Sequence, residues 1–90
     1  MRRVIERIEY TSNFLNCYKK LPKILSSEVL EREKIFREDC FDPRLKTHKL
    51  HGKHKDVWSF YITYKYIIIF RFITEHSVEF IDVGDHSIYQ

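Results

Sequence analysis

Hydrophobic positions at the start of the chain predict a short strand followed by a helix. In Arg2–Ile8, apolar and charged residues alternate imperfectly, which is typical of a strand at the edge of a sheet. Thr11 or Ser12 can then cap a helix, because either hydroxyl can accept a hydrogen bond from the first helical turn. Apolar residues follow at the helical spacing i, i+3, i+4 and i+7, namely Phe14, Cys17, Tyr18 and Leu21.

The pattern after Pro22 predicts a second helix. Proline either ends one helix or occupies the first position of the next, since it lacks a backbone N–H. Between Lys23 and about Asp39, charged residues surround one apolar stripe made of Leu21, Leu25, Val29 and Phe36. Two helices joined this closely predict a helical hairpin.

Residues after Asp39 lose the helical period. Phe41–Pro43 is predicted to end the helical region, because the residue before a proline disfavours the helical conformation. Arg44–Asp56 has neither the helical nor the strand period and contains Gly52, which predicts a loop that could include one short strand.

The last third of the chain predicts three consecutive strands. Val57–Thr63 alternates cleanly, so that every second residue faces the core. Tyr66–Ile73 is apolar on both faces apart from Arg71, which is typical of a central strand covered on both sides. Ser77–Val83 is the third strand.

Short connections join these strands into a single small fold. Turns are predicted at Tyr64–Lys65 and Thr74–His76, and Gly84 is predicted to end the last strand and leave Asp85–Gln90 as a tail. The order β-α-α-β-β-β indicates the α+β class, as a small antiparallel β-sheet with an N-terminal helical hairpin packed on one face. A chain of 90 residues supplies one core, so residues 1–90 are predicted to form one domain.

Composition supports a globular protein without membrane segments. Apolar residues make up 43% of the chain, and no run approaches the roughly 18 apolar residues that a membrane span needs. The charged start of the chain predicts no signal peptide. Cys17 and Cys40 are too few for a disulfide framework, so we expect a reduced, cytoplasmic protein.

Positive charge is concentrated in one segment. Arg44–Lys55, called the basic loop below, holds five of the 16 Lys and Arg residues and three of the five histidines, but no acid. The rest of the chain carries 11 basic against 13 acidic residues. A concentrated basic patch is the pattern expected for a polyanionic partner such as nucleic acid, although a solvated loop has the same composition.

Several residue patterns could carry chemistry. The spacing His48-x-x-His51-x-x-His54 could bind a metal, but Gly52 interrupts any helix that would align the three rings, and we expect no metal and no cofactor. His86 and Tyr89, just past the last strand, could serve as acid, base or stacking groups. Cys17 falls on an apolar helix face, where a core role is more common than a nucleophilic one.

Several segments of the chain occur in an order and spacing that match a known family. The central one is Phe41–Lys53, which covers most of the basic loop. The others are Phe14–Pro22, Trp58–Ile62, Tyr66–Phe70, Ile81–His86 and Tyr89. This ordered set resembles the RelE/ParE superfamily of toxins from type II toxin–antitoxin systems, and within it the RelE- and YafQ-like mRNA interferases. The resemblance covers nearly the whole chain.

The resemblance implies an activity and a set of partners. It implies a toxin that cleaves mRNA on the ribosome without a metal, and that a cognate antitoxin protein neutralises. It implies no membrane and no small-molecule cofactor. His48 and His86 match positions implicated in the family's catalytic site, as complementary acid and base in either order. The implied catalytic residues are His48, His86, Tyr61 and Lys65, and the implied RNA- or ribosome-binding residues are Arg44, Lys46, Lys49, His51, Lys53, His54, Lys55, Arg71 and Tyr89.

Three positions depart from the family pattern. Tyr61 stands where many relatives have Arg or His, Ile67 where many have Arg, and Lys65 where YafQ-like members have an acid. An arginine at the second place would clamp the transition-state phosphorane, and Lys65, Lys55 or Arg71 could supply the missing cation. A catalytically weak toxin, a ParE-like inhibitor of DNA gyrase without enzymatic activity, and a simple nucleic-acid-binding module are therefore the alternatives.

Overall fold

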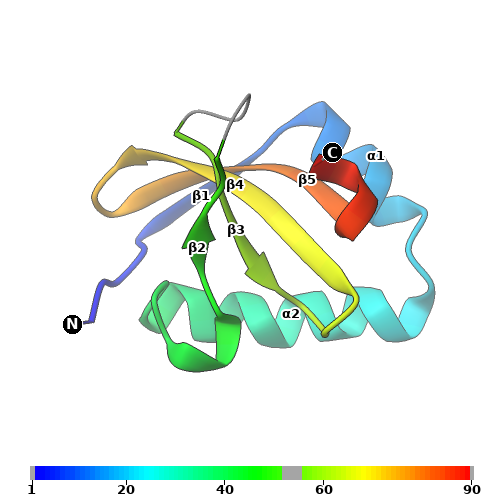
Figure 1. Cartoon of the computed structure of the whole chain (residues 1–90), viewed down its shortest axis with the longest axis horizontal. Coiled ribbons are helices and arrows are strands. Elements are labelled where there is room, and N and C mark those ends of the chain that lie inside the picture. Colours follow the sequence, from blue (N-terminus) through cyan, green and yellow to red (C-terminus); the bar gives the residue numbers. More distant parts are fainter. Residues whose placement is uncertain (1, 52–55, 90) are drawn as a thin grey trace.

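A five-stranded sheet organises the chain in the computed structural model, which describes residues 2–51 and 56–89 (Figure 1). The elements in chain order are β1 (Arg7–Tyr10), α1 (Ser12–Lys19), α2 (Lys23–Glu38), the 3₁₀ helix η1 (Pro43–Leu45), β2 (His48–Lys49), β3 (Trp58–Tyr61), β4 (Tyr66–Thr74), β5 (Ser77–Asp85) and the 3₁₀ helix η2 (His86–Tyr89). The spatial order of the strands is β1-β5-β4-β3-β2. The α+β class and the helical hairpin are confirmed.

The sheet is mixed rather than wholly antiparallel. β2, β3, β4 and β5 pair antiparallel in sequence, whereas β1 pairs parallel to β5. β1 lies at the edge, as expected, but it begins at Arg7 rather than Arg2. The preceding residues bond instead to the end of α2: the Ile5 N–H donates to Arg37 O at 2.9 Å, and the Cys40 N–H donates to Arg3 O at 3.0 Å.

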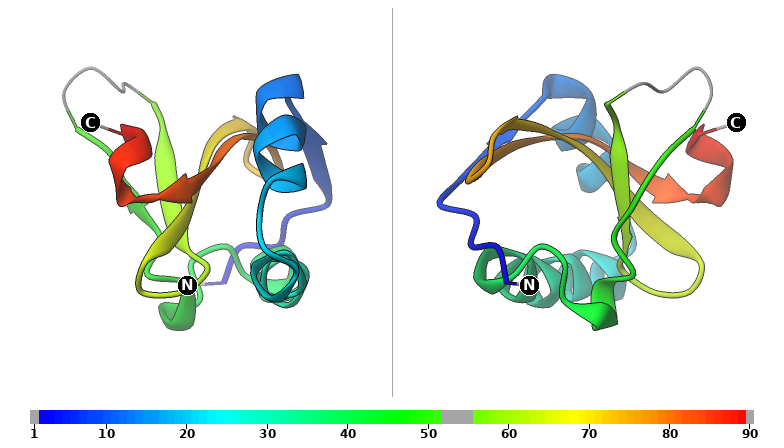
Figure 2. Two further views of the ribbon diagram at one scale, coloured as in Figure 1. Left: turned by 90° about the vertical axis from the view of Figure 1, so that its right-hand side faces the viewer. Right: turned by 60° about the vertical axis from the view of Figure 1, so that its left-hand side comes forward.

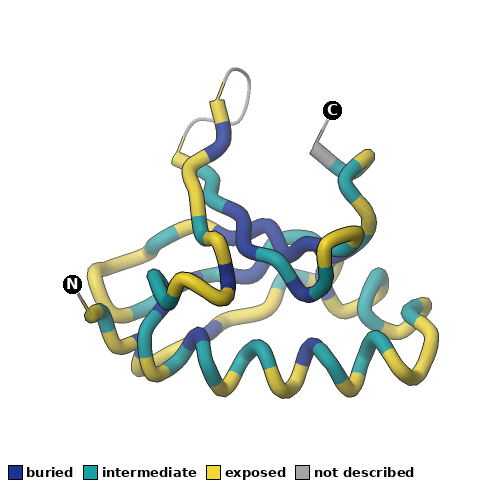
Figure 3. Tube along the Cα trace, turned by 60° about the horizontal axis from the view of Figure 1, so that its bottom comes forward, coloured by how far each residue is buried: buried dark blue, intermediate teal, exposed yellow. Residues whose placement is uncertain are grey.

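Both helices cover the same face of the sheet (Figure 2). The Thr11 side chain caps α1 by accepting a hydrogen bond from the Phe14 N–H at 3.0 Å, and Pro22 stands at the N-cap of α2. α2 alternates between exposed and more buried residues along its length, which follows its apolar stripe (Figure 3). Phe36 is fully buried on that stripe and contacts the rings of Phe60, Phe70 and Phe80.

The opposite face of the sheet has a smaller apolar cluster, called the outer cluster below. Its buried residues are Leu50, Ile67 and Ile69, and Val57, Tyr61, Ile81 and Ile88 pack against them. The buried run at the start of β4 therefore contributes side chains to both faces, which confirms β4 as a central strand.

The end of β5 differs from the prediction. Gly84 does not end the strand: β5 continues to Asp85, with Gly84 paired to Ile67, and the predicted tail forms η2. A Cβ at Gly84 would lie 2.8 Å from Ile88 Cγ2, so the missing side chain makes room for η2 to fold over the sheet. The β3–β4 connection is also longer than predicted, because the bond from the Ile62 N–H to Tyr66 O encloses residues 62–66.

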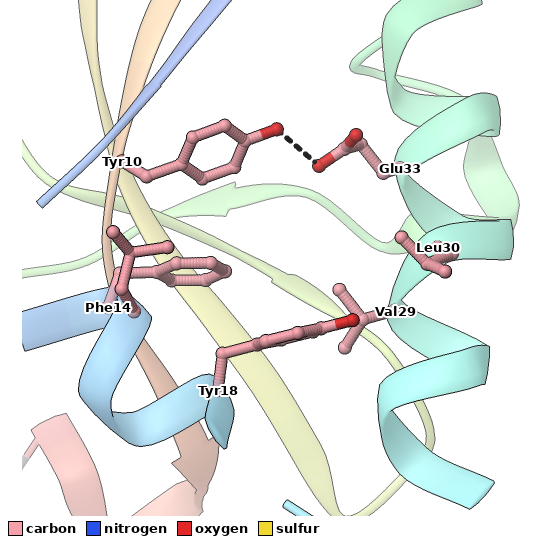
Figure 4. A pocket seen from close by; sticks show the side chains of 7 residues that line it. Tyr10, Phe14, Tyr18, Val29, Leu30 and Glu33 are labelled. Carbon is pink, nitrogen blue, oxygen red and sulfur yellow. Dashed lines mark hydrogen bonds between the residues drawn. The ribbon is translucent and has the colours of Figure 1, made fainter. Parts of the chain in front are cut away.

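An apolar groove of about 190 Å³ remains between α1, α2 and β1 (Figure 4). The Tyr10 hydroxyl donates to Glu33 Oε1 across its rim at 2.9 Å. The residues that line it are Tyr10, Phe14, Leu15, Tyr18, Val29, Leu30 and Glu33. Among the described residues, no helix is long and apolar enough to span a membrane.

Replacing Phe36 by Ala tests the packing of α2 on the sheet. We expect the free energy of unfolding to fall by about 3–5 kcal/mol, because the truncation leaves a cavity among three buried aromatic rings. Urea titration monitored by circular dichroism measures the change. Ile24→Ala, at an 80% exposed position of the same helix, is the control and should change the value little. Equal effects of the two variants would contradict this account of the core.

Candidate functional site

The chain reaches the sheet after α2 through a short turn at η1. The Asp42 side chain accepts from the Arg44 N–H at 2.9 Å and pairs with the Arg44 guanidinium, Nη2 to Oδ2, at 2.8 Å. Leu45 anchors the turn in the core, and Lys46 adopts the left-handed conformation with φ 52°. This reversal directs the next residues into β2, where His48 pairs with Ser59 of β3.

The Asp42–Arg44 pair also lowers the pKa of the Asp42 carboxyl group. Hydrogen bonds from the Arg44 side chain and its backbone N–H favour the charged carboxylate and hold the pKa of Asp42 at about 2, below its ordinary 3.8. Because the Arg44 side chain is exposed and the Asp42 side chain is only partly buried, solvent screens the pair and its contribution to global stability is small.

A backbone carbonyl orients the His48 ring. His48 Nδ1 lies 3.0 Å from Lys46 O. A carbonyl oxygen only accepts, so Nδ1 carries the proton, and in the neutral ring the lone pair lies on Nε2. Because His48 is exposed, its ring and the Nε2 atom lie at the molecular surface.

A second backbone carbonyl orients His86, here through Nε2 instead of Nδ1. His86 begins η2, whose first turn is held by the Ser87 N–H donating to Asp85 Oδ1 at 3.0 Å. Hydrogen bonds from the Ser87 side chain and backbone lower the pKa of Asp85, and the nearby charge of Lys65 adds to the effect. His86 Nε2 lies 3.1 Å from Tyr64 O, so the proton of the neutral ring is on Nε2.

Tyr61 lies close to both histidines. Its ring centroid is 6.3 Å from that of His48 and 5.2 Å from that of His86, and the Lys46 Nζ lies 5.9 Å from the same centroid. Four of the residues singled out from the sequence therefore converge, from the turn that ends η1 and from β2, β3 and η2. They do so on the face of the sheet that the helices leave uncovered.

This cluster has the groups that RNA transesterification requires. The reaction needs a base for the 2′-hydroxyl, an acid for the departing 5′-oxygen and a cation for the charge that develops on phosphorus. Two imidazoles with defined tautomers and one lysine ammonium can supply all three without a metal. Ile67 is fully buried and is the β4 partner of Tyr61, and the Lys46 ammonium lies 5.9 Å from the centroid of the Tyr61 ring.

Other predicted residues lie away from this cluster. Arg71 forms an ion pair with Glu79 at 2.9 Å. It lies five residues along β4 from Tyr66, and Tyr66 pairs with Asp85, the residue before His86. At about 3.3 Å per residue, Arg71 is roughly 16 Å along the strand from the His86 end of β4. Lys49 approaches Asp56 at 3.9 Å, and His51 lies past the end of β2. Lys53, His54 and Lys55 lie outside the described residues, as does the side chain of Tyr89.

The structure adds residues that the sequence analysis did not single out. A polar groove of about 170 Å³ adjoins the cluster, and Arg44, Lys46 and Tyr61 line it together with Arg32, Ile62, Thr63 and Tyr64. The signal available in the sequence was an aromatic residue, Tyr64, in a predicted turn. Within residues 2–51 and 56–89, no group of three potential ligands is placed to hold a metal ion.

Comparison with known proteins identifies the fold. No family model matches the chain, and no curated protein matches it in sequence. Among solved structures, the YoeB/ParE toxin from Agrobacterium tumefaciens superposes with a TM-score of 0.74 at 16% identity, covering 90% of this chain and 99% of that one. A chain of the toxin–antitoxin complex RelBE2 from Mycobacterium tuberculosis gives 0.77 at 19% identity, covering 93% and 94%.

A third structure extends the comparison to the branch suggested by the sequence. A chain of the DinJ–YafQ toxin–antitoxin complex from E. coli gives a TM-score of 0.72 at 19% identity, covering 97% of this chain and 96% of that one. The chain thus has the fold of the RelE/ParE toxins, including the YafQ-like branch, and the resemblance drawn from the sequence is confirmed at the level of fold.

Adding a methyl group at Gly84 should disturb η2. Gly84→Ala is expected to lower the free energy of unfolding by about 1–3 kcal/mol, because its Cβ would overlap the Ile88 side chain. Chemical denaturation measures the loss, and the NMR shifts of the His86 ring report the displacement of η2. In the double variant Gly84→Ala/Ile88→Ala the glycine substitution should cost much less, and strictly additive losses would contradict the contact.

Acid titration tests the Asp42–Arg44 pair. The folded pKa of Asp42 is lowered, so its stabilising contribution is complete above its ordinary pKa of 3.8 and is lost as the pH falls through about 2. Thermal unfolding between these pH values should show a smaller decline in Tm for Asp42→Asn than for the unmodified chain. Arg44→Ala should give the same flatter profile, and an unchanged profile in both variants would refute the assignment.

Proposed function

We propose that the chain is the toxin of a toxin–antitoxin pair and acts as a metal-independent, ribosome-dependent endoribonuclease on mRNA. The observation that supports this most directly is the convergence of His48, His86 and Lys46 around Tyr61 on an exposed sheet face. Similarity of fold alone would not support a reaction, since one fold can host several functions.

In the proposed reaction, the 2′-hydroxyl of one nucleotide attacks the adjacent phosphorus. The new 2′-O–P bond forms as the P–O5′ bond breaks, which leaves a 2′,3′-cyclic phosphate and a 5′-hydroxyl. One imidazole accepts the 2′-hydroxyl proton, and the other, in its protonated form, gives a proton to the departing 5′-oxygen. The Lys46 ammonium stabilises the charge on the non-bridging oxygens.

Hydrogen bonds to the two carbonyls prepare the histidines for these roles. Each ring gives one N–H to a backbone oxygen, His48 to Lys46 O and His86 to Tyr64 O, and these bonds fix the orientation of both rings. Both rings lie beside Tyr61. In the proposed reaction the base and the acid act on the two sides of one phosphate, as an in-line displacement requires.

The proposed partners are mRNA, the ribosome and an antitoxin protein. Exposed cations of the basic loop, such as Arg44, Lys46 and Lys49, would contact phosphates of mRNA or ribosomal RNA. Two of the solved structures above are named as toxin–antitoxin complexes. An acidic segment of a cognate antitoxin would cover the basic loop by charge complementarity and so block the site.

The alternative is a toxin that inhibits DNA gyrase without catalysis. One similar structure carries the name YoeB/ParE, so the fold is compatible with both. A purely binding protein has no need of two histidines held in defined tautomers around one ring. That arrangement favours the nuclease.

The decisive test is primer extension on a defined mRNA in a reconstituted translation system, with and without ribosomes. We expect cuts at fixed codon positions only when ribosomes are present. His48→Ala and His86→Ala should each reduce cleavage by about 10²–10⁴-fold, the range for removal of a general acid or base. Circular dichroism verifies that the variants fold.

His76→Ala is the matched control, because this exposed histidine lies in the β4–β5 turn and also bonds a backbone carbonyl, Val4 O, at 2.8 Å. It should cleave as the unmodified chain does. Undiminished cleavage by both site variants would overturn the site. An unmodified chain that makes no cuts but inhibits gyrase supercoiling would establish the alternative.

A further inference from the structure

The polar groove beside the histidine cluster has three walls from distant parts of the chain. Arg44 and Lys46 belong to the η1 turn, Thr63 and Tyr64 to the β3–β4 turn, and Arg32 to α2. The groove holds three cations and two aromatic rings, Tyr61 and Tyr64, with no carboxylate among its lining residues. That combination is typical of sites for single-stranded nucleic acid.

The arginines of the groove are held in place before any ligand binds. The Arg32 Nη1 donates to Arg44 O at 3.1 Å, and its Nε approaches Glu28 at 3.4 Å. Arg44 uses Nε and one terminal nitrogen for Asp42, at 3.0 and 2.8 Å. A guanidinium has five N–H donors in a fixed plane, so Arg44 still presents donors to a phosphate. Ordering these side chains in advance lowers the entropic cost of binding.

Tyr64 is the most exposed large apolar side chain of the groove, at 87% exposure. Among the described residues its ring stacks on no other aromatic side chain. An aromatic ring at the tip of a turn, beside cations, offers a face on which a base can stack.

The groove and the histidines are connected through the backbone. Lys46 and Tyr64 line the groove, and their carbonyl oxygens accept the hydrogen bonds of His48 and His86. The groove therefore adjoins both imidazoles through these two residues.

We propose that this groove binds one nucleotide of single-stranded RNA, adjacent to the phosphate that lies between His48 and His86. The Tyr64 ring stacks on its base, and Arg44 and Arg32 contact its phosphate. This subsite rests on the proposed nuclease function, because it places the RNA strand for the reaction derived above. It adds Tyr64 and Arg32 as binding residues that position the strand and take no part in proton transfer.

Binding of a non-cleavable RNA tests the subsite apart from catalysis. The probe is a fluorescein-labelled hexanucleotide with 2′-O-methyl groups throughout, titrated with the full chain at low salt and followed by anisotropy. Tyr64→Ala should weaken binding about tenfold, as expected for loss of one base stack. Tyr64→Phe keeps the ring and should bind within about twofold of the unmodified chain.

A second arm examines the phosphate contact. Arg44→Ala should reduce the slope of log affinity against log salt by about 0.7, the value for one phosphate on a single strand. Arg7→Ala is the matched control, because Arg7 is also an exposed arginine paired with a carboxylate, Glu9 at 3.1 Å, on the opposite edge of the sheet. Its slope should stay unchanged, so equal changes in both variants would reduce the effect to general electrostatics and overturn the phosphate contact.

A third arm removes the base instead of the ring. Hexanucleotides with one abasic position, moved along the strand, should include one that Tyr64→Ala and the unmodified chain bind equally. The proposal is overturned if Tyr64→Ala binds as tightly as the unmodified chain, if it weakens every abasic probe as much as the intact one, or if the unmodified chain binds no RNA.

The two proposals fail separately. A chain that cuts mRNA while Tyr64→Ala binds RNA normally would leave the nuclease standing and remove the subsite. A chain that shows the Tyr64 effect on RNA binding but makes no cuts would retain the subsite as an RNA-binding groove and remove the nuclease.

Discussion

Phe36, packed between α2 and the sheet, holds the helical layer of the fold on the strands. Its ring meets Phe60 of β3, Phe70 of β4 and Phe80 of β5, and is fully buried. These rings belong to the larger of the two apolar clusters and provide much of its apolar area. With both helices held on one face, the other face is left to short elements, and the candidate site lies there.

The outer cluster shows how a small fold can keep an exposed site in order. Leu50, Ile67 and Ile69 are covered by the end of β2 and by η2 rather than by a long helix. Gly84 allows η2 to approach because Ile88 occupies the space of the missing Cβ. The same contact brings His86 beside Tyr61, so a packing requirement on one face also determines where a catalytic candidate lies.

Backbone carbonyls, more than side chains, orient the candidate site. His48 bonds to the residue two before it, whereas His86 bonds across 22 residues to Tyr64. The first bond is a product of the local turn at Lys46, which requires the left-handed conformation. The second exists only because β3, β4 and β5 bring the β3–β4 turn beside η2. The β4 residue that pairs with Tyr61 is the buried, uncharged Ile67. The ammonium beside the Tyr61 ring belongs instead to Lys46, which lies in a turn.

Elements with local signals could be predicted from the amino-acid sequence alone. Phe14 and its helical partners, the Thr11 cap, the stripe to Phe36 and the two-sided apolar run of β4 all follow from period and side-chain chemistry, and they hold in the structure. The basic loop and both histidines could also be identified, since charge density and residue type can be read from the sequence without a structure.

Features set by long-range contacts could not be predicted from the sequence. The parallel pairing of β1 with β5, the continuation of β5 through Gly84 and the groove that joins Arg32 to Tyr64 each depend on residues far apart in the chain. From its neighbours in the sequence, Gly84 predicts the end of a strand. In the folded chain its missing side chain leaves room for Ile88, a contact that forms only when η2 packs over the sheet.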